Sequence, residues 1–178
     1  MNGDPLSVAA AELFAPLLKE QGFRKRRLTW NRSEFGFTSV VNVQRSQWGS
    51  RDHCVFMVNL AVGFQPEGAG RFLMEYDCPS FLRRRLNDRL PGDYDNAWTI
   101  DPNTLEIARV VVGECRDDLE KFGLPWLSNL RLPTQVIATL QDEIARRSAR
   151  GAKRWIAEAE AAVQRAQKMM RQMDDSKI

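Results

Sequence analysis

Two stretches of alternating residues, Phe37 to Gln47 and His53 to Gly63, constrain the fold of this chain more than any other feature. A period of two between apolar and polar positions is typical of β-strands, in which successive side chains point to opposite faces. The five residues between the stretches, 48–52, have the length of a hairpin loop. The sequence therefore predicts a long antiparallel pair, with Val41, Val43, Phe56, Val58 and Leu60 in the core.

Helical patterns flank this pair on both sides. Asp4-Pro5 is a helix-start signal, and Gly22 is placed to end that helix in the left-handed conformation. Pro16 predicts a kink or a restart within it. A second helix is expected from Asp101-Pro102 to Gly123, where apolar residues recur at spacings of three and four.

The remaining elements complete an α+β fold, because the strands and helices are segregated along the chain. We expect an antiparallel sheet of about four or five strands, packed by the N-terminal helix and later helices, with a C-terminal helical hairpin. The hairpin would follow a cap at Thr134 and turn near Gly151. Residues 1–130 would form the core domain, and 131–178 the appended hairpin. The additional short strands are expected at Leu28–Asn31, Phe81–Leu86 and Ala97–Ile100.

Composition narrows the class of protein. The chain has 178 residues, 43% of them hydrophobic, and a net charge of +3, which is too small to imply nucleic acid by itself. No stretch approaches the roughly 20 apolar residues of a membrane span, and the N-terminus does not resemble a signal peptide. The three scattered cysteines predict reduced thiols rather than disulfides. We therefore expect a cytoplasmic protein without a cofactor.

Several short motifs in this order and spacing resemble a known family. They are Gly22-Phe23 with the basic residues after it, Trp30, the segment Val41–Ser46 and the segment Phe56–Val62. Over roughly residues 8 to 128 the chain resembles the mainly bacterial family catalogued as domain of unknown function 4304. That family often has Gly where Ala61 stands. The resemblance implies strands flanked by helices, and it implies no activity.

The usual catalytic and metal-binding patterns do not support a site here. His53, the one histidine, and Cys54 are neighbours on a predicted strand, so their side chains point to opposite faces and cannot pair. One histidine and three separated cysteines lack the spacing of zinc ligands. The sequence therefore predicts neither a catalytic cysteine nor a structural metal.

Polar side chains gather instead on one face of the predicted hairpin. Asn42, Gln44 and Ser46 share a face of one strand, and Asn59 joins them if the register is right. Uncharged donors and acceptors suit a peptide backbone, a base edge or a small polar ligand, although a solvated outer face needs such residues too. The candidate ligand-binding residues are Asn42, Gln44, Ser46, Asn59, Arg84 and Trp48, with Arg32 or an arginine from 83–85 at the rim.

Three functions follow from these features. The leading interpretation is a non-enzymatic binding module, an accessory or immunity-type protein, that binds a protein or peptide partner. The second is a nucleic-acid-associated protein using the basic runs 24–27 and 83–85 with Arg89, near Trp30 and Trp48. The third is an enzyme without metal or thiol chemistry, which would need a deep pocket holding Arg84 or Glu75. The oligomeric state stays open, because the stripe of the last helix fits both a hairpin and a dimer.

Overall fold

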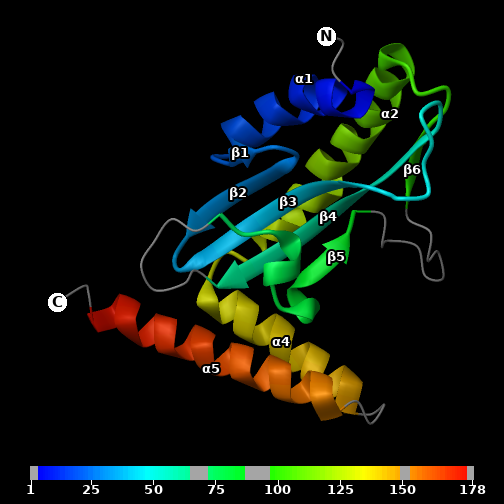
Figure 1. Ribbon diagram of the computed structural model, residues 1–178. Helices are drawn as coiled ribbons and strands as arrows, with labels where there is room; N and C mark the ends of the chain where they lie inside the picture. The colour runs from blue at the N-terminus through cyan, green and yellow to red at the C-terminus, as the bar shows by residue number, and fades with distance from the viewer. Residues whose placement is uncertain (1–3, 65–71, 87–96, 149–152, 176–178) are drawn as a thin grey trace.

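The computed structural model describes residues 4–64, 72–86, 97–148 and 153–175, and an antiparallel sheet of six strands lies at its centre (Figure 1). The strand order is β1-β2-β3-β4-β5, and β6 also pairs with β4. This confirms the α+β class with one more strand than expected, because the first basic run forms an edge strand. The bounds are β1 Arg24–Arg26, β2 Thr29–Glu34, β3 Phe37–Arg45, β4 Cys54–Phe64, β5 Arg83–Arg85 and β6 Trp98–Ile100.

The central pair has the register that the alternation predicted. Val41 lies opposite Leu60, and Asn42 lies opposite Asn59. One face of the sheet therefore collects the apolar side chains and is called the helix face below. The other carries the amides and is called the polar face. All five predicted core residues are at most 4% exposed, which confirms that part of the prediction: Val41, Val43, Phe56, Val58 and Leu60.

Helices cover the helix face, and α2 passes behind the sheet in Figure 1. They are α1 (Pro5–Glu20), α2 (Leu105–Asp118), the π-helical stretch η3 (Leu119–Gly123) and α3 (Leu124–Ser128). The Asp4 carboxylate caps α1 by accepting from the Ser7 N–H at 3.1 Å, and Gly22 follows it with φ +80°. α1 continues through Pro16, so the expected restart there is wrong. Pro16 lies on the exposed side of the helix, while the buried side packs on the sheet.

Two helix boundaries in the middle of the chain differ from the prediction. α2 begins after Thr104, whose hydroxyl accepts from the Ile107 N–H at 3.3 Å, and not at Asp101-Pro102. Gly123 does not end the helix, because its φ of −72° is helical and the chain continues into α3. A Cβ at Gly123 would lie 2.7 Å from Leu119 Cδ1. Close packing, and not a left-handed turn, requires glycine there.

The C-terminal helices α4 (Pro133–Ser148) and α5 (Lys153–Asp175) lie side by side at one end of the sheet (Figure 1). This confirms the predicted hairpin, while its turn near Gly151 lies outside the described residues. α4 begins one residue before the expected cap at Thr134. The hairpin meets the β2–β3 turn, where a Cβ at Gly36 would lie 3.0 Å from Met169 Cε, and Arg165 lies over the Phe64 ring.

The segment 72–82 crosses part of the polar face in two short 3₁₀ turns, η1 (Glu75–Asp77) and η2 (Ser80–Leu82). Leu73 and Cys78 form a small second core with Val40 and Ala61. The Asn31 amide donates to the Leu73 carbonyl at 3.0 Å and accepts from the Leu73 N–H at 2.7 Å. Segment and sheet are therefore joined by apolar contact and by a paired amide. Of the helices described, none is both long and apolar enough to cross a membrane.

Candidate functional site

A hydrogen-bonded row of polar side chains crosses the polar face. In the strand register Thr29, Asn42 and Asn59 lie directly opposite one another on β2, β3 and β4. Asn59 Nδ2 donates to Asn42 Oδ1 at 3.3 Å, and Asn42 Nδ2 donates to Thr29 Oγ1 at 2.8 Å. Asn59 Nδ2 also donates to Gln44 Oε1 at 2.9 Å. The structure thus brings the three predicted amides together and adds a threonine that the sequence analysis did not single out.

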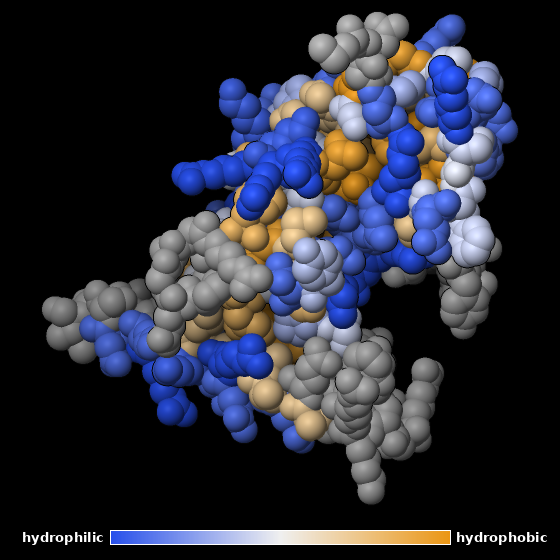
Figure 2. Space-filling view, in the orientation of Figure 1, coloured by the Kyte–Doolittle hydropathy of each residue, from blue (hydrophilic) through white to orange (hydrophobic). Residues whose placement is uncertain are grey.

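Exposure rises along β3 from this row toward the loop before β4. Asn42 and Asn59 are each 7% exposed, whereas the side chain of Gln44 is exposed. Ser46 follows, and its hydroxyl accepts from the Trp48 N–H at 3.2 Å. Trp48 itself is 83% exposed. Figure 2 shows hydrophilic side chains over the middle of this face. The open part of the polar face therefore runs from Gln44 to Trp48, and we call Gln44, Ser46 and Trp48 the open strip.

Two of the candidate arginines, Arg84 and Arg32, do not lie on the polar face, whereas two arginines of the run 83–85 do. Arg84 pairs with Leu60 and so points to the helix face, where its guanidinium lies 5.5 Å from the Trp126 ring centroid. Arg32 also lies on the helix face. Arg83 and Arg85, opposite Ala61 and Asn59, lie on the polar face instead. Side chains alternate between the two faces even in a strand of three residues. The middle arginine of the run therefore points to the face opposite to that of its two neighbours.

A pocket of about 790 Å³ opens where the turn between β1 and β2 meets the row. Thr29 and Asn42 reach it from the polar face, Lys25 lies opposite Trp30 on the helix-face side of β1, and Arg27 comes from the turn, so the pocket lies at the edge of the sheet. Lys25 Nζ lies 5.4 Å from the Trp30 ring centroid, so the buried indole supports it. Arg27 holds a left-handed φ of 56° at the tip of the turn, a conformation that costs free energy in a residue other than glycine. The remaining lining residues are Ser7, Leu28 and Met74.

The hydrogen bonds of the row have one direction toward this pocket. Each amide N–H donates to the next side chain, and Thr29 Oγ1 accepts at the end. Thr29 is 2% exposed and lines the pocket, and its hydroxyl proton is not used in the bond with Asn42. Hydrogen bonds in such a chain polarise one another, which makes the last donor stronger. With Lys25 and Arg27 also lining it, the pocket suits an acceptor that carries negative charge.

The sequence analysis missed the pocket because its residues come from separate elements. The basic run 24–27 was considered only for nucleic-acid binding, and nothing local shows that the β1–β2 turn folds beside Asn42. One signal was present. The run directly precedes the strand predicted at Leu28–Asn31, so a reversal of the chain there would bring Lys25 and Arg27 close to Thr29.

The thiols and the histidine do not form a reactive pair. His53 Nδ1 lies 3.1 Å from Asp101 Oδ2 at the surface, while Cys54 is buried in the core. Burial raises the pKa of Cys54 and of Cys115, and it raises the pKa of Cys78 to about 12. Thiols with a raised pKa are poor nucleophiles near neutral pH. Over the described residues, no three His, Cys, Asp or Glu side chains gather as metal ligands would.

Comparison with known proteins gives one match. The model of the family described as Domain of unknown function (DUF4304) matches residues 14–129. These residues hold the whole sheet, the C-terminal part of α1 and the helices up to α3, and they end before α4. No curated protein and no solved structure matches the chain significantly.

Proposed function

We propose that this chain, which belongs to the DUF4304 family, is a non-enzymatic binding module that docks an acidic segment of a partner protein on its polar face. The observation that carries the proposal is the pocket at the end of the amide row. There two cations and a polarised hydroxyl donor line a cavity of about 790 Å³. An Asp or Glu side chain of the partner would accept from Thr29 and pair with Lys25 and Arg27.

The open strip would hold the rest of the docked segment. Gln44 offers an exposed amide, and Ser46 lies two residues further along the same face. Trp48 supplies a large exposed aromatic surface, the kind of residue that provides much of the free energy at protein interfaces. A segment extended along β3 would meet the cationic pocket at one end and an aromatic anchor at the other.

A protein partner fits these contacts better than nucleic acid. Base stacking on this side of the molecule would need exposed aromatic rings beside the basic run, but Trp30 is 1% exposed and packs against Phe14. Trp48 lies at the far end of the open strip, away from the basic run, and Arg89 lies outside the described residues. The exposed run 24–27 still attracts anions in general, so nucleic acid is a competing outcome of the test.

Selection of peptides tests the proposal directly. A library of random 12-residue peptides displayed on phage would be panned against the purified protein, and enriched peptides measured by fluorescence anisotropy. We expect the enriched peptides to carry Asp or Glu at a common position. Lys25→Ala with Arg27→Ala should weaken their binding at least tenfold, because charge-assisted hydrogen bonds contribute about 1.5–3 kcal/mol. Thr29→Val should weaken it several-fold.

Matched variants separate the pocket from general positive charge. Lys121→Ala removes an exposed lysine from η3, which covers the helix face, and should leave peptide affinity unchanged. The proposal fails if no acidic motif is enriched, or if the double variant binds the selected peptides as tightly as the parent. Tighter binding of a 12-nucleotide single strand, with affinity falling steeply with salt, would favour the nucleic-acid interpretation.

The proposal also includes the cellular compartment. We place the protein in the cytoplasm of a bacterium, and the support is the chemistry of its cysteines. All three thiols are buried, each with a raised pKa, so they are kept reduced and unreactive. Fractionation of cells producing a tagged chain would check this, and recovery in the membrane or periplasmic fraction would contradict it.

A further inference from the structure

Arg32 is a buried cation that uses little of its hydrogen-bonding capacity. It lies on the helix face of β2, is 8% exposed, and its guanidinium stacks on the Phe23 ring at 4.8 Å. Nη1 donates to the Gln21 carbonyl at 3.2 Å. Nε and Nη2 have no hydrogen-bond partner among the residues that the structure describes. These two groups form the side-on edge with which arginine binds a carboxylate through two parallel hydrogen bonds.

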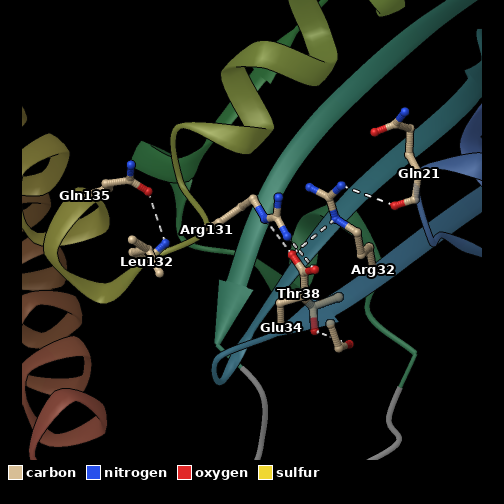
Figure 3. Close-up of polar contacts among 8 residues, drawn as sticks. Gln21, Arg32, Glu34, Thr38, Arg131, Leu132 and Gln135 are labelled. Atoms are coloured by element: carbon tan, nitrogen blue, oxygen red, sulfur yellow. Dashed lines mark hydrogen bonds and ion pairs between the residues drawn. The ribbon is translucent and has the colours of Figure 1, made fainter. Parts of the chain in front are cut away.

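The nearest carboxylate is already bound elsewhere. Glu34 accepts from Arg131 Nε at 2.7 Å and from Arg131 Nη2 at 2.6 Å, while its Oε2 lies 3.6 Å from Arg32 Nε (Figure 3). The cluster therefore holds two guanidinium groups and one carboxylate. Burial lowers the pKa of Arg32, Glu34 raises it, and Arg131 lowers it. Burial is the largest of these effects, and the net shift of the Arg32 pKa is downward.

We propose that Arg131 is the receptor for a small oxyanion, a carboxylate or phosphate group, and that Glu34 transfers to Arg32 when this ligand binds. Arg131 is 40% exposed and Glu34 31%, so a ligand can reach them from solvent. Arg32 is enclosed and cannot take the ligand itself. Glu34 Oε2 needs to move only about 0.7 Å closer to reach the usual 2.9 Å from Arg32 Nε.

The exchange replaces one paired site by two. Before binding, the Glu34 carboxylate pairs with Arg131, and Nε and Nη2 of Arg32 donate to no described residue. Each buried donor without an acceptor lowers the stability of the folded protein. After binding, the ligand pairs with Arg131 and Glu34 pairs with Arg32. The main chain at Arg131 is held in place, because Gln135 Oε1 accepts from the Leu132 N–H at 3.2 Å at the start of α4 (Figure 3). Side chains alone need to move.

A second pair on the surface provides a matched control. Arg109 on α2 donates to Glu12 on α1 at 2.7 and 2.9 Å, the same two-bond geometry as Arg131 with Glu34. Within the described residues, Glu12 is ion-paired with no second arginine. A ligand that displaced Glu12 would leave that carboxylate without a new partner. The proposal therefore expects an oxyanion to bind at Arg131 and not at Arg109.

The experiment is an NMR titration of the arginine Nε–H groups with inorganic phosphate, at constant pH and at an ionic strength balanced with sodium chloride. We expect the signals of Arg131 and Arg32 to shift along one saturating curve, and the signal of Arg109 to stay in place. An identical titration with acetate tells whether a carboxylate serves as well as a phosphate. Arg131→Gln should abolish saturation and leave the Arg32 signal unmoved.

A variant of the competing carboxylate sharpens the test. Glu34→Gln removes the internal competitor and should tighten phosphate binding at least fivefold, whereas Glu12→Gln should change it less than twofold. The proposal is overturned if the shifts are linear and equal to those in chloride, if Arg131→Gln leaves the curve intact, or if Arg32 does not follow Arg131. Should Glu34→Gln fail to fold, the titration of the unchanged protein still decides. This site shares no residue with the pocket, so either proposal can fail alone.

Discussion

The two faces of the sheet come from the same strands and yet differ in what their side chains do. On the helix face, β3 and β4 contribute residues such as Val41 and Leu60, which are buried under helices. On the polar face the same strands contribute Asn42 and Asn59, which are nearly as buried but are satisfied by one another. Burial by itself therefore does not separate structural from functional residues. What separates them is the kind of contact that each side chain makes. Apolar packing leaves no room for a ligand, whereas a row of hydrogen-bonded side chains can end in an open pocket.

The largest expected effect lies on the helix face. Phe56→Ala removes a fully buried ring and should lower the free energy of unfolding by about 3–5 kcal/mol, because the cavity cannot collapse fully between strand and helices. Urea denaturation followed by circular dichroism measures it. Phe35→Ala, at a site 50% exposed, is the control and should cost far less. Equal costs at the two positions would mean that the core is not where the structure places it.

A comparable loss on the polar face would come from Asn31, where the segment 72–82 is attached. Asn31→Ala removes two hydrogen bonds and leaves the N–H and C=O of Leu73 unpaired, so we expect a loss of about 2–3 kcal/mol. Thermal unfolding of this variant beside Thr99→Ala, an exposed position on the same face, gives the comparison. A loss no larger than that of Thr99→Ala would show that the segment is held by apolar contact alone.

Gly63 tests how closely the segment approaches the sheet. A Cβ there would lie 2.7 Å from Leu73 Cδ1 and 3.0 Å from Cys78 Sγ, so Gly63→Ala should destabilise the fold by about 1–2 kcal/mol. Gly113 in α2 is the matched control, because an added Cβ meets no atom within 4 Å. Gly113→Ala should stabilise the protein by about 0.5–1 kcal/mol through helix propensity. The denaturant midpoint should fall for Gly63→Ala and rise for Gly113→Ala. A higher midpoint for Gly63→Ala would show that Leu73 and Cys78 do not lie this close to the sheet.

Much of the fold could be predicted from the sequence because it depends on local periodicity. The alternation along residues 37–47 and 53–63 was enough to predict an antiparallel pair and the buried side of each strand, and Asn59 shares the face of Asn42 as expected. Boundaries set by tertiary packing could not be predicted. A glycine at position 123 is typical of a helix end, but here it is required by close contact with Leu119. Pro16 is accommodated within α1 on the side that faces solvent.

The candidate site could be predicted only where it lies within one hairpin. Asn42, Gln44 and Ser46 share a strand, so their common face follows from the pleat. The same pocket is also lined by Lys25 of β1, Arg27 of the following turn and Ser7 of α1. No spacing in the sequence relates these residues to Asn42. Arg84 was predicted on the wrong face of the sheet. Which face each residue of β5 points to depends on its pairing with β4, and the sequence does not show that pairing.

The smallest expected changes in stability come from the polar row, where they should distinguish a buried structural residue from an accessible one. Asn59→Ala leaves the buried Asn42 Oδ1 without its donor and should cost about 1–2 kcal/mol. Gln44→Ala removes an exposed amide that only accepts from Asn59, so its cost should stay within about 0.5 kcal/mol. A double-mutant cycle in urea measures both, and their coupling should be small because water can replace Gln44. If Gln44→Ala costs as much as Asn59→Ala, then Gln44 is fixed within the row and the open strip is not free to exchange water for a partner. A small cost with unchanged peptide binding would instead show that the partner docks on Trp48 and the pocket without using Gln44.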